Sequence, residues 1–96
     1  MPAVAGVFKA LSEPTRLEIL LALSPNGRAV YQVVERTALS QPLVSHHLAV
    51  LRDAGLVRAE RKGNHVFYGW CSPALEHLVQ DAAQISREVN ETRHTH

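Results

Sequence analysis

The chain has 96 residues, of which 46% are hydrophobic and 20% charged, an ordinary soluble globular composition that fits one small domain over residues 1–96 and no more. Its formal net charge of +1 is far below that of domains whose basic charge alone reveals a nucleic-acid partner. A single cysteine, Cys71, excludes an internal disulfide, and the lack of a signal-peptide pattern or of any apolar run near the roughly 20 residues of a membrane span predicts a cytoplasmic protein with no membrane partner.

The first two predicted helices follow each other closely. Apolar residues recur at helical spacing and predict an amphipathic helix over about residues 3–11. A second helix is expected over 13–23, where Ser12 is suited to cap it and Pro14 falls in the first turn, which needs no backbone donor there. The segment SPNG, residues 24–27, ends this helix.

A third and a fourth helix are predicted over about residues 30–38 and 41–54. Only the short segment ALSQ joins them, so the second of the pair is held across the first. Ser40 is a good cap for the fourth helix, and Gly55 suits the left-handed residue just past its end. The apolar stripe that should face the core consists of Val44, Leu48 and Leu51.

After Gly55 the pattern of apolar residues changes from the spacing of a helix to that of strands. Residues 56–70 read as a two-stranded hairpin around a turn at Gly63–Asn64, and Ser72 with Pro73 opens a last helix over about 73–90. A fold that is mainly α with one two-stranded β-hairpin placed after two short helices is the layout of a winged helix-turn-helix, with the hairpin as the wing.

The outer face of the fourth helix is polar once its apolar stripe is buried. Gln41 could pair with an adenine edge, Ser45 and His46 suit base edges or phosphates, and Arg52 suits a phosphate. His47 lies at the margin of the stripe. On the hairpin, the residues expected to reach the neighbouring backbone or the minor groove are Arg58, Arg61, Lys62, Asn64 and His65.

Three stretches in one collinear order, FKALSEPTRLEILLAL, LSQPLVSHHLAVLRDAGLV and RKGNHVFYGW, resemble the ArsR/SmtB family of bacterial transcriptional repressors over roughly residues 4–89. The resemblance implies a homodimer, an operator in double-stranded DNA with approximate two-fold symmetry, and repression that an inducer relieves. It carries the family's DNA contacts to Ser40, Gln41, Ser45, His46 and His47, and to the hairpin tip. It places the dimer interface on the first and last helices, at Val4, Val7, Phe8, Leu11, Leu75, Leu78, Ala82, Ile85 and Val89.

The adjacent histidines have different expected roles. His46 is expected to contact DNA, while for His47 a structural role at the margin of the core is open beside a DNA contact. The two rings do not suit one metal ion, because neighbours in a helix point about 100° apart.

The metal sites of the resembling family lack most of their ligands here. The positions of its cysteine pair hold Ala29 and Tyr31, and of its four ligands on the last helix only Glu88 remains. A nickel or zinc site on the last helix and tail is one hypothesis, and a polar tail in a repressor of its own operon without a metal inducer is the alternative. The candidate ligands are His77, Glu88, His94 and His96.

Two other functions compete with DNA binding. Catalysis is not expected, because Ser45 and His46 diverge on a helix and Cys71 has no neighbour in the sequence to activate it. A winged-helix module used only for protein contacts is the second rival. The polar outer face and the basic hairpin favour DNA.

Overall fold

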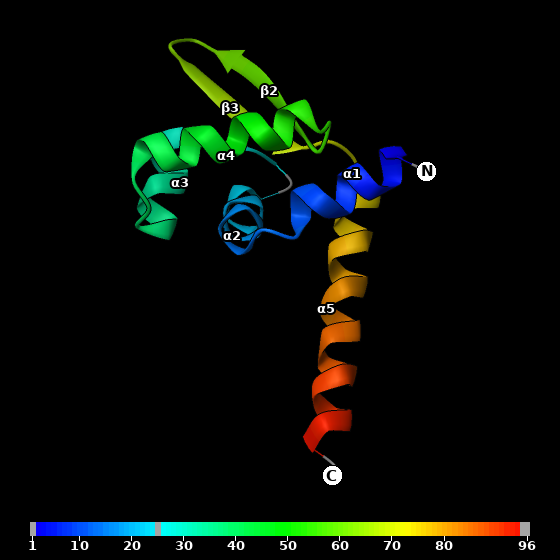
Figure 1. Cartoon of the computed structure of the whole chain (residues 1–96). Coiled ribbons are helices and arrows are strands. Elements are labelled where there is room, and N and C mark those ends of the chain that lie inside the picture. Colours follow the sequence, from blue (N-terminus) through cyan, green and yellow to red (C-terminus); the bar gives the residue numbers. More distant parts are fainter. Residues whose placement is uncertain (1, 25, 95–96) are drawn as a thin grey trace.

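Five helices and a small three-stranded sheet form the described part of the chain, residues 2–24 and 26–94, in a computed structural model (Figure 1). The predicted winged helix-turn-helix, mainly α with one hairpin, is confirmed. Within the described residues, no helix combines the length and the apolar character needed to cross a membrane. In chain order the elements are α1 (Pro2–Leu11), α2 (Pro14–Leu23), β1 (Arg28–Ala29), α3 (Val30–Thr37), α4 (Gln41–Asp53), β2 (Val57–Lys62), β3 (His65–Trp70) and α5 (Pro73–His94).

Helix α2 lies at the centre of the core, in contact with α1, α3, α4 and β3. Its residues Ile19, Leu20 and Leu23 have no exposed surface, and neither have Val33 of α3 and Leu48 of α4. Burying one such side chain contributes about 1.5–3 kcal/mol. The short helices α3 and α4 are therefore held in place by a shared apolar support rather than by their own helical stability.

The turn between α3 and α4 is closed by local hydrogen bonds. Ala38 adopts a left-handed conformation, with φ of 59°, and its N–H donates to the carbonyl of Val34 at 2.9 Å. The Ser40 hydroxyl accepts a hydrogen bond from the backbone N–H of Leu43 at 3.3 Å, which confirms the predicted cap. These bonds fix the direction in which α4 leaves α3.

The wing is an antiparallel hairpin that projects from the helical body (Figure 1). Its strands pair from Val57 with Trp70 to Lys62 with His65, and Gly63 in the turn has a φ of 63°. A third strand was not predicted. Strand β1 pairs with β3, and two residues are too few to show a period in the sequence.

The sheet is tied to the end of α2 by side chains. The indole N–H of Trp70 donates to the carbonyl of Leu20 at 2.8 Å, and Arg28 donates from Nη1 to the carbonyl of Ala22 at 2.7 Å. Both carbonyls belong to the last turn of α2, where a helix leaves its C=O groups without internal partners. These bonds set the position of the wing relative to the helical core.

Two helix ends differ from the sequence expectation. Ser12 does not cap α2. Its hydroxyl donates to the carbonyl of Lys9 at 2.8 Å, while the carboxylate of Glu13 accepts the backbone N–H of Arg16 at 2.8 Å and so caps the helix. Helix α5 continues to His94 instead of ending near residue 90, because no glycine or proline interrupts it.

We expect the substitution Trp70→Phe to lower the free energy of unfolding by about 1–3 kcal/mol, because it leaves the buried carbonyl of Leu20 without its donor. Urea denaturation followed by circular dichroism measures this change. Tyr31→Phe is the control, since Tyr31 is 49% exposed and its substitution should change stability by less than about 0.5 kcal/mol. Equal effects of the two substitutions would contradict the role given to the indole.

Candidate nucleic-acid interface

Helix α4 has a buried side and a polar exposed side. Val44, Leu48 and Leu51 are fully buried. Gln41, His46 and Arg52 are exposed on the other side, and Ser45 is half-buried. The amide of Gln41 donates to the hydroxyl of Ser45 at 3.3 Å, so these two polar groups lie together one helical turn apart. Short polar side chains on an exposed helix can exchange such bonds for bonds to base edges.

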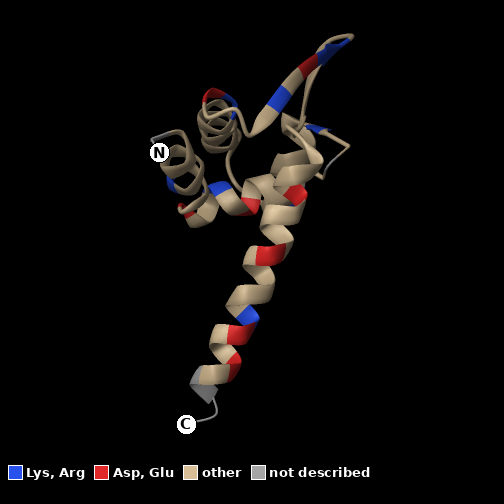
Figure 2. Ribbon diagram, turned by 90° about the vertical axis from the view of Figure 1, so that its right-hand side faces the viewer, with Lys and Arg blue, Asp and Glu red and all other residues tan. Residues whose placement is uncertain are grey.

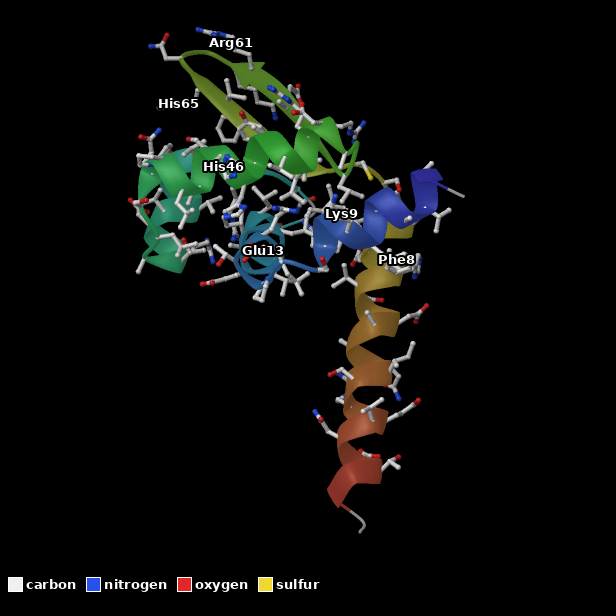
Figure 3. The ribbon with its side chains drawn as sticks, in the orientation of Figure 1. Phe8, Lys9, Glu13, His46, Arg61 and His65 are labelled. Atoms are coloured by element: carbon white, nitrogen blue, oxygen red, sulfur yellow. The ribbon has the colours of Figure 1, made fainter. Side chains whose placement is uncertain are left out.

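The wing carries the basic side chains. Arg58, Arg61, Lys62, Asn64 and His65 are all exposed. Side chains alternate along a strand, so Arg58 and Lys62 lie on one face of the hairpin and Arg61 on the other. The ammonium of Lys62 lies 5.7 Å from the centre of the Phe67 ring. Figures 2 and 3 show that positive charge reaches the tip of the wing and that the wing extends beyond α4, which carries His46.

The wing also contacts the helix-turn-helix through a pair of rings. The ring centres of His65 on β3 and Tyr31 on α3 are 5.3 Å apart and tilted by 54°. This contact joins the hairpin to α3. The wing is therefore held against α3, the helix that precedes α4, by side chains as well as by the sheet.

His47 points inward, unlike its neighbour His46. It is 8% exposed, and its Nδ1 accepts a hydrogen bond from Nε of Arg16 at 3.4 Å. Its Nε2 lies 3.8 Å from a carboxylate oxygen of Glu13. A nitrogen that accepts from a guanidinium carries no proton, so the neutral ring has its hydrogen on Nε2. The structure thus places His47 on the buried side of α4 and gives it the structural position that the sequence had left open beside a DNA contact.

The two neighbours of His47 were missed in the sequence. Arg16 donates from Nη1 to the carbonyl of Ala10 at 3.0 Å, and Glu13 caps α2. The hydrogen bond from the backbone of Arg16 lowers the pKa of Glu13 below its ordinary value of 4.5. Burial lowers the pKa of His47 below 6.5, and the nearby Glu13 opposes this shift in part. Pro14 at the first helical position, directly after Glu13, was the available sign that residue 13 is the cap.

Apolar surface is exposed on the opposite part of the molecule. Val4 and Phe8 on α1 are 44% and 57% exposed, and Ile85 and Val89 on α5 are 59% and 46% exposed. Leu75 is only 4% exposed and belongs to the buried core of its own chain, while Val7, Leu11 and Leu78 are partly buried and pack against that core. A groove of about 570 Å³ runs between α1, α2 and α5 and is lined by Phe8, Leu11, Leu17, Leu21, Leu78, Val79, Ala82 and Ala83 together with two serines. Figure 3 shows Phe8 beside the start of α5.

The predicted metal ligands are not brought together in the part of the chain that the structure describes. His77 is exposed, and Glu88 accepts a hydrogen bond from Gln84 at 3.1 Å. Among the described residues, no group of three histidine, cysteine or acidic side chains is placed to hold an ion. The side chain of His94 and the whole of His96 lie outside the described part, so the tail hypothesis stays a prediction.

Comparison with known proteins gives one consistent result. Residues 13–59 match the family described as bacterial regulatory protein, arsR family. The HTH-type transcriptional repressor SmtB of Mycobacterium tuberculosis is 39% identical over 92% of this chain, which spans 65% of that repressor's length. A probable mercury resistance operon repressor of Streptomyces lividans is 40% identical over 88% of this chain and 67% of its own length.

Among solved structures, a homodimeric winged helix-turn-helix DNA-binding domain of Mycobacterium bovis, named as a possible ArsR-family regulator, superposes with a TM-score of 0.84. The two chains are 31% identical, and the match covers 91% of this chain and 81% of that one. The likeness in structure therefore extends well beyond residues 13–59, which match the family.

We expect the free energy of unfolding to fall as the pH is lowered from about 7 to about 5. The pKa of His47 is lower in the folded chain than its ordinary value of 6.5, so the unfolded chain binds more protons in this range. The stabilising contribution is complete above the unfolded pKa and is lost as the pH falls through the folded pKa.

Urea denaturation at a series of pH values measures this dependence. His47→Asn is the control, because an asparagine oxygen can accept from Arg16 but does not titrate. The free energy of unfolding should fall more steeply with decreasing pH in the wild type than in His47→Asn, and the difference is the contribution of His47. Parallel curves for the two proteins would contradict the assigned pKa direction.

Proposed function

Because the chain belongs to the ArsR family of bacterial transcriptional regulators, which are DNA-binding proteins and not enzymes, we propose that it is a homodimeric repressor that binds an operator of approximate two-fold symmetry. The observation that carries the proposal is the polar, exposed side of α4 lying beside a cationic wing. Recognition helices of this fold enter the major groove and the wing contacts the adjacent backbone.

The contacts that we propose divide into two groups. Gln41 and Ser45, which already bond to each other at 3.3 Å, would read base edges from α4, and His46 would read a base edge or bind a phosphate. Side chains that bind phosphates position the protein without reading sequence. We assign that role to Arg52, Arg58, Arg61 and Lys62, with Asn64 and His65 at the wing tip and Ser40 at the start of α4.

We propose that α1 and α5 form the dimer interface. Large exposed apolar side chains on one region mark protein interfaces in small domains, and Phe8, Ile85 and Val89 are exposed there beside the apolar groove. Such an interface would fix the distance between two α4 helices. For an operator read in successive major grooves that distance is about 34 Å along the duplex.

The inducer is proposed from the ligand chemistry of this chain. Similar proteins are named for mercury and cadmium resistance, but the positions of the family's cysteine pair hold Ala29 and Tyr31 here. Soft thiolate chemistry therefore has no matching pair, and imidazole ligands suit nickel or zinc. Nickel or zinc bound by His94 and His96 is the metal hypothesis, and repression of its own operon without a metal inducer is the alternative.

A winged-helix module for protein contacts alone is the competing function. Such a module has no need of a polar α4 face or of exposed basic side chains on the wing, and this chain has both. Binding to DNA fragments at several salt concentrations separates the two functions. A protein-contact module would give no sequence-specific complex.

We expect Arg61→Ala or Lys62→Ala to weaken binding to all DNA sequences and to reduce the slope of log affinity against log salt by about 1 for each phosphate that the variant no longer binds. Fluorescence anisotropy with duplexes selected from a random pool measures both quantities.

Arg87→Ala is the control for net charge. Arg87 is exposed on α5 and donates to Gln84 at 2.9 Å, so its removal changes the total charge equally but far from the wing. If this variant lowered the salt slope as much as Arg61→Ala, the wing would not be the phosphate-binding element.

We expect Gln41→Ala to relax sequence preference at one position of each half-site, with a loss of discrimination of about 1–3 kcal/mol. Selection of bound sequences from the random pool, with the wild type in parallel, measures the preference. If Gln41→Ala left both affinity and preference unchanged, the exposed side of α4 would not be the reading face.

A further inference from the structure

The guanidinium of Arg16 joins two helices that make little other contact. Its Nη1 donates to the carbonyl of Ala10 in the last turn of α1, and its Nε donates to Nδ1 of His47 on the inner side of α4. Both acceptors are shielded from solvent, with Ala10 5% and His47 8% exposed. Because a guanidinium is planar and rigid, its two donors keep a fixed relation to each other.

We propose that Arg16 and His47 are positioning residues that transmit the placement of α1, and with it the packing of the dimer, to the recognition helix α4. This inference rests on the proposed function, since it gives that DNA-binding face a control. A displacement of the end of α1 moves the Ala10 carbonyl, and the guanidinium cannot follow it without lengthening its bond to His47.

The effect reaches the exposed face through His46. The rings of His46 and His47 have centres 5.1 Å apart and meet edge to face at 61°. His47 is anchored by Arg16, so the exposed ring of His46 rests against a side chain whose own position depends on α1. The link therefore runs from a helix of the proposed dimer interface to a side chain of the proposed DNA-binding face.

Protonation of His47 breaks the link. The titratable and charged groups that face the ring are Glu13 and Arg16 from α2 and its cap, and His46 from α4. A proton on Nδ1 turns the acceptor into a donor that faces the guanidinium, so the bond from Arg16 is lost. Arg16 then still bonds to the carbonyl of Ala10 on α1 but no longer bonds to α4.

Four variants test the inference. His47→Asn keeps an acceptor for Arg16 without a titrating group, and His47→Phe keeps a ring beside His46 without an acceptor. Arg16→Lys keeps the charge but loses the planar pair of donors. Arg87→Lys is the matched control, because the guanidinium of Arg87 also donates a hydrogen bond, to Gln84 on its own helix at 2.9 Å, but does not bond to α4 or to the wing.

Affinity is measured by fluorescence anisotropy with duplexes that the wild type selects from a random pool, well below the melting temperature of every variant. We expect His47→Phe and Arg16→Lys to bind about tenfold more weakly than wild type, within the usual range of coupling between sites. We expect His47→Asn and Arg87→Lys to stay within about twofold of wild type at pH 7.5.

The pH profile separates positioning from a general loss of stability. On acidification from about pH 7.5 to about pH 5.5, the DNA affinity of the wild type should fall relative to that of His47→Asn. The ratio of the affinities of His47→Phe and His47→Asn should stay constant, because neither variant has a titrating group at position 47.

The inference is overturned if the wild type selects DNA but Arg16→Lys loses no more affinity than Arg87→Lys, or if wild type and His47→Asn have the same pH profile. Should His47→Phe fail to fold, the comparison of the two lysine variants decides. A wild type that selects no DNA would instead overturn the proposed function.

Discussion

The architecture depends on how the two ends of α2 are held. At its C-terminal end, the buried indole of Trp70 and the guanidinium of Arg28 satisfy carbonyls that a helix cannot satisfy itself. At its N-terminal end, Glu13 accepts the backbone N–H of Arg16, whose side chain reaches α1 and α4. The sheet is thereby attached to one end of a buried helix and α4 to the other, so the wing and the exposed side of α4 hold a fixed relation. In a small and therefore marginally stable core these bonds matter because a buried polar group left without its partner costs about 1–3 kcal/mol.

The fold could be predicted because its main signals are local. Val44, Leu48 and Leu51 recur at helical spacing and are all fully buried. Gly55 and Gly63 have φ values of 78° and 63°, as a helix end and a turn require. The strand β1 escaped prediction because its two residues have no period of their own and form a strand only by pairing with β3. The extent of α5 was underestimated because the polar residues near its end show no apolar period that would mark them as helical.

The site was predictable only on its exposed side. The apolar residues at helical spacing on α4 were enough to predict that Gln41 and His46 face outward. The direction of His47 depends on Arg16, which lies 31 positions earlier in the chain. No periodicity joins residues so far apart, and both side chains are of types usually exposed. The cap at Glu13 had a local sign, but serine is the stronger capping type, and the adjacent Ser12 therefore pointed to the wrong residue.

The distribution of charge explains why the total charge was uninformative. Acidic side chains follow α5 away from the body, among them Asp81, Glu88 and Glu91, while Arg61 and Lys62 stand on the wing (Figure 2). The longest dimension of the molecule is 54 Å, several times the Debye length of about 8 Å at physiological salt. Charges at one end therefore scarcely screen those at the other, and a duplex that approaches the wing meets a local positive field although the whole chain carries only +1. The same separation of charge gives the molecule an electric dipole, which would turn the wing, and not α5, toward a polyanion before any contact forms.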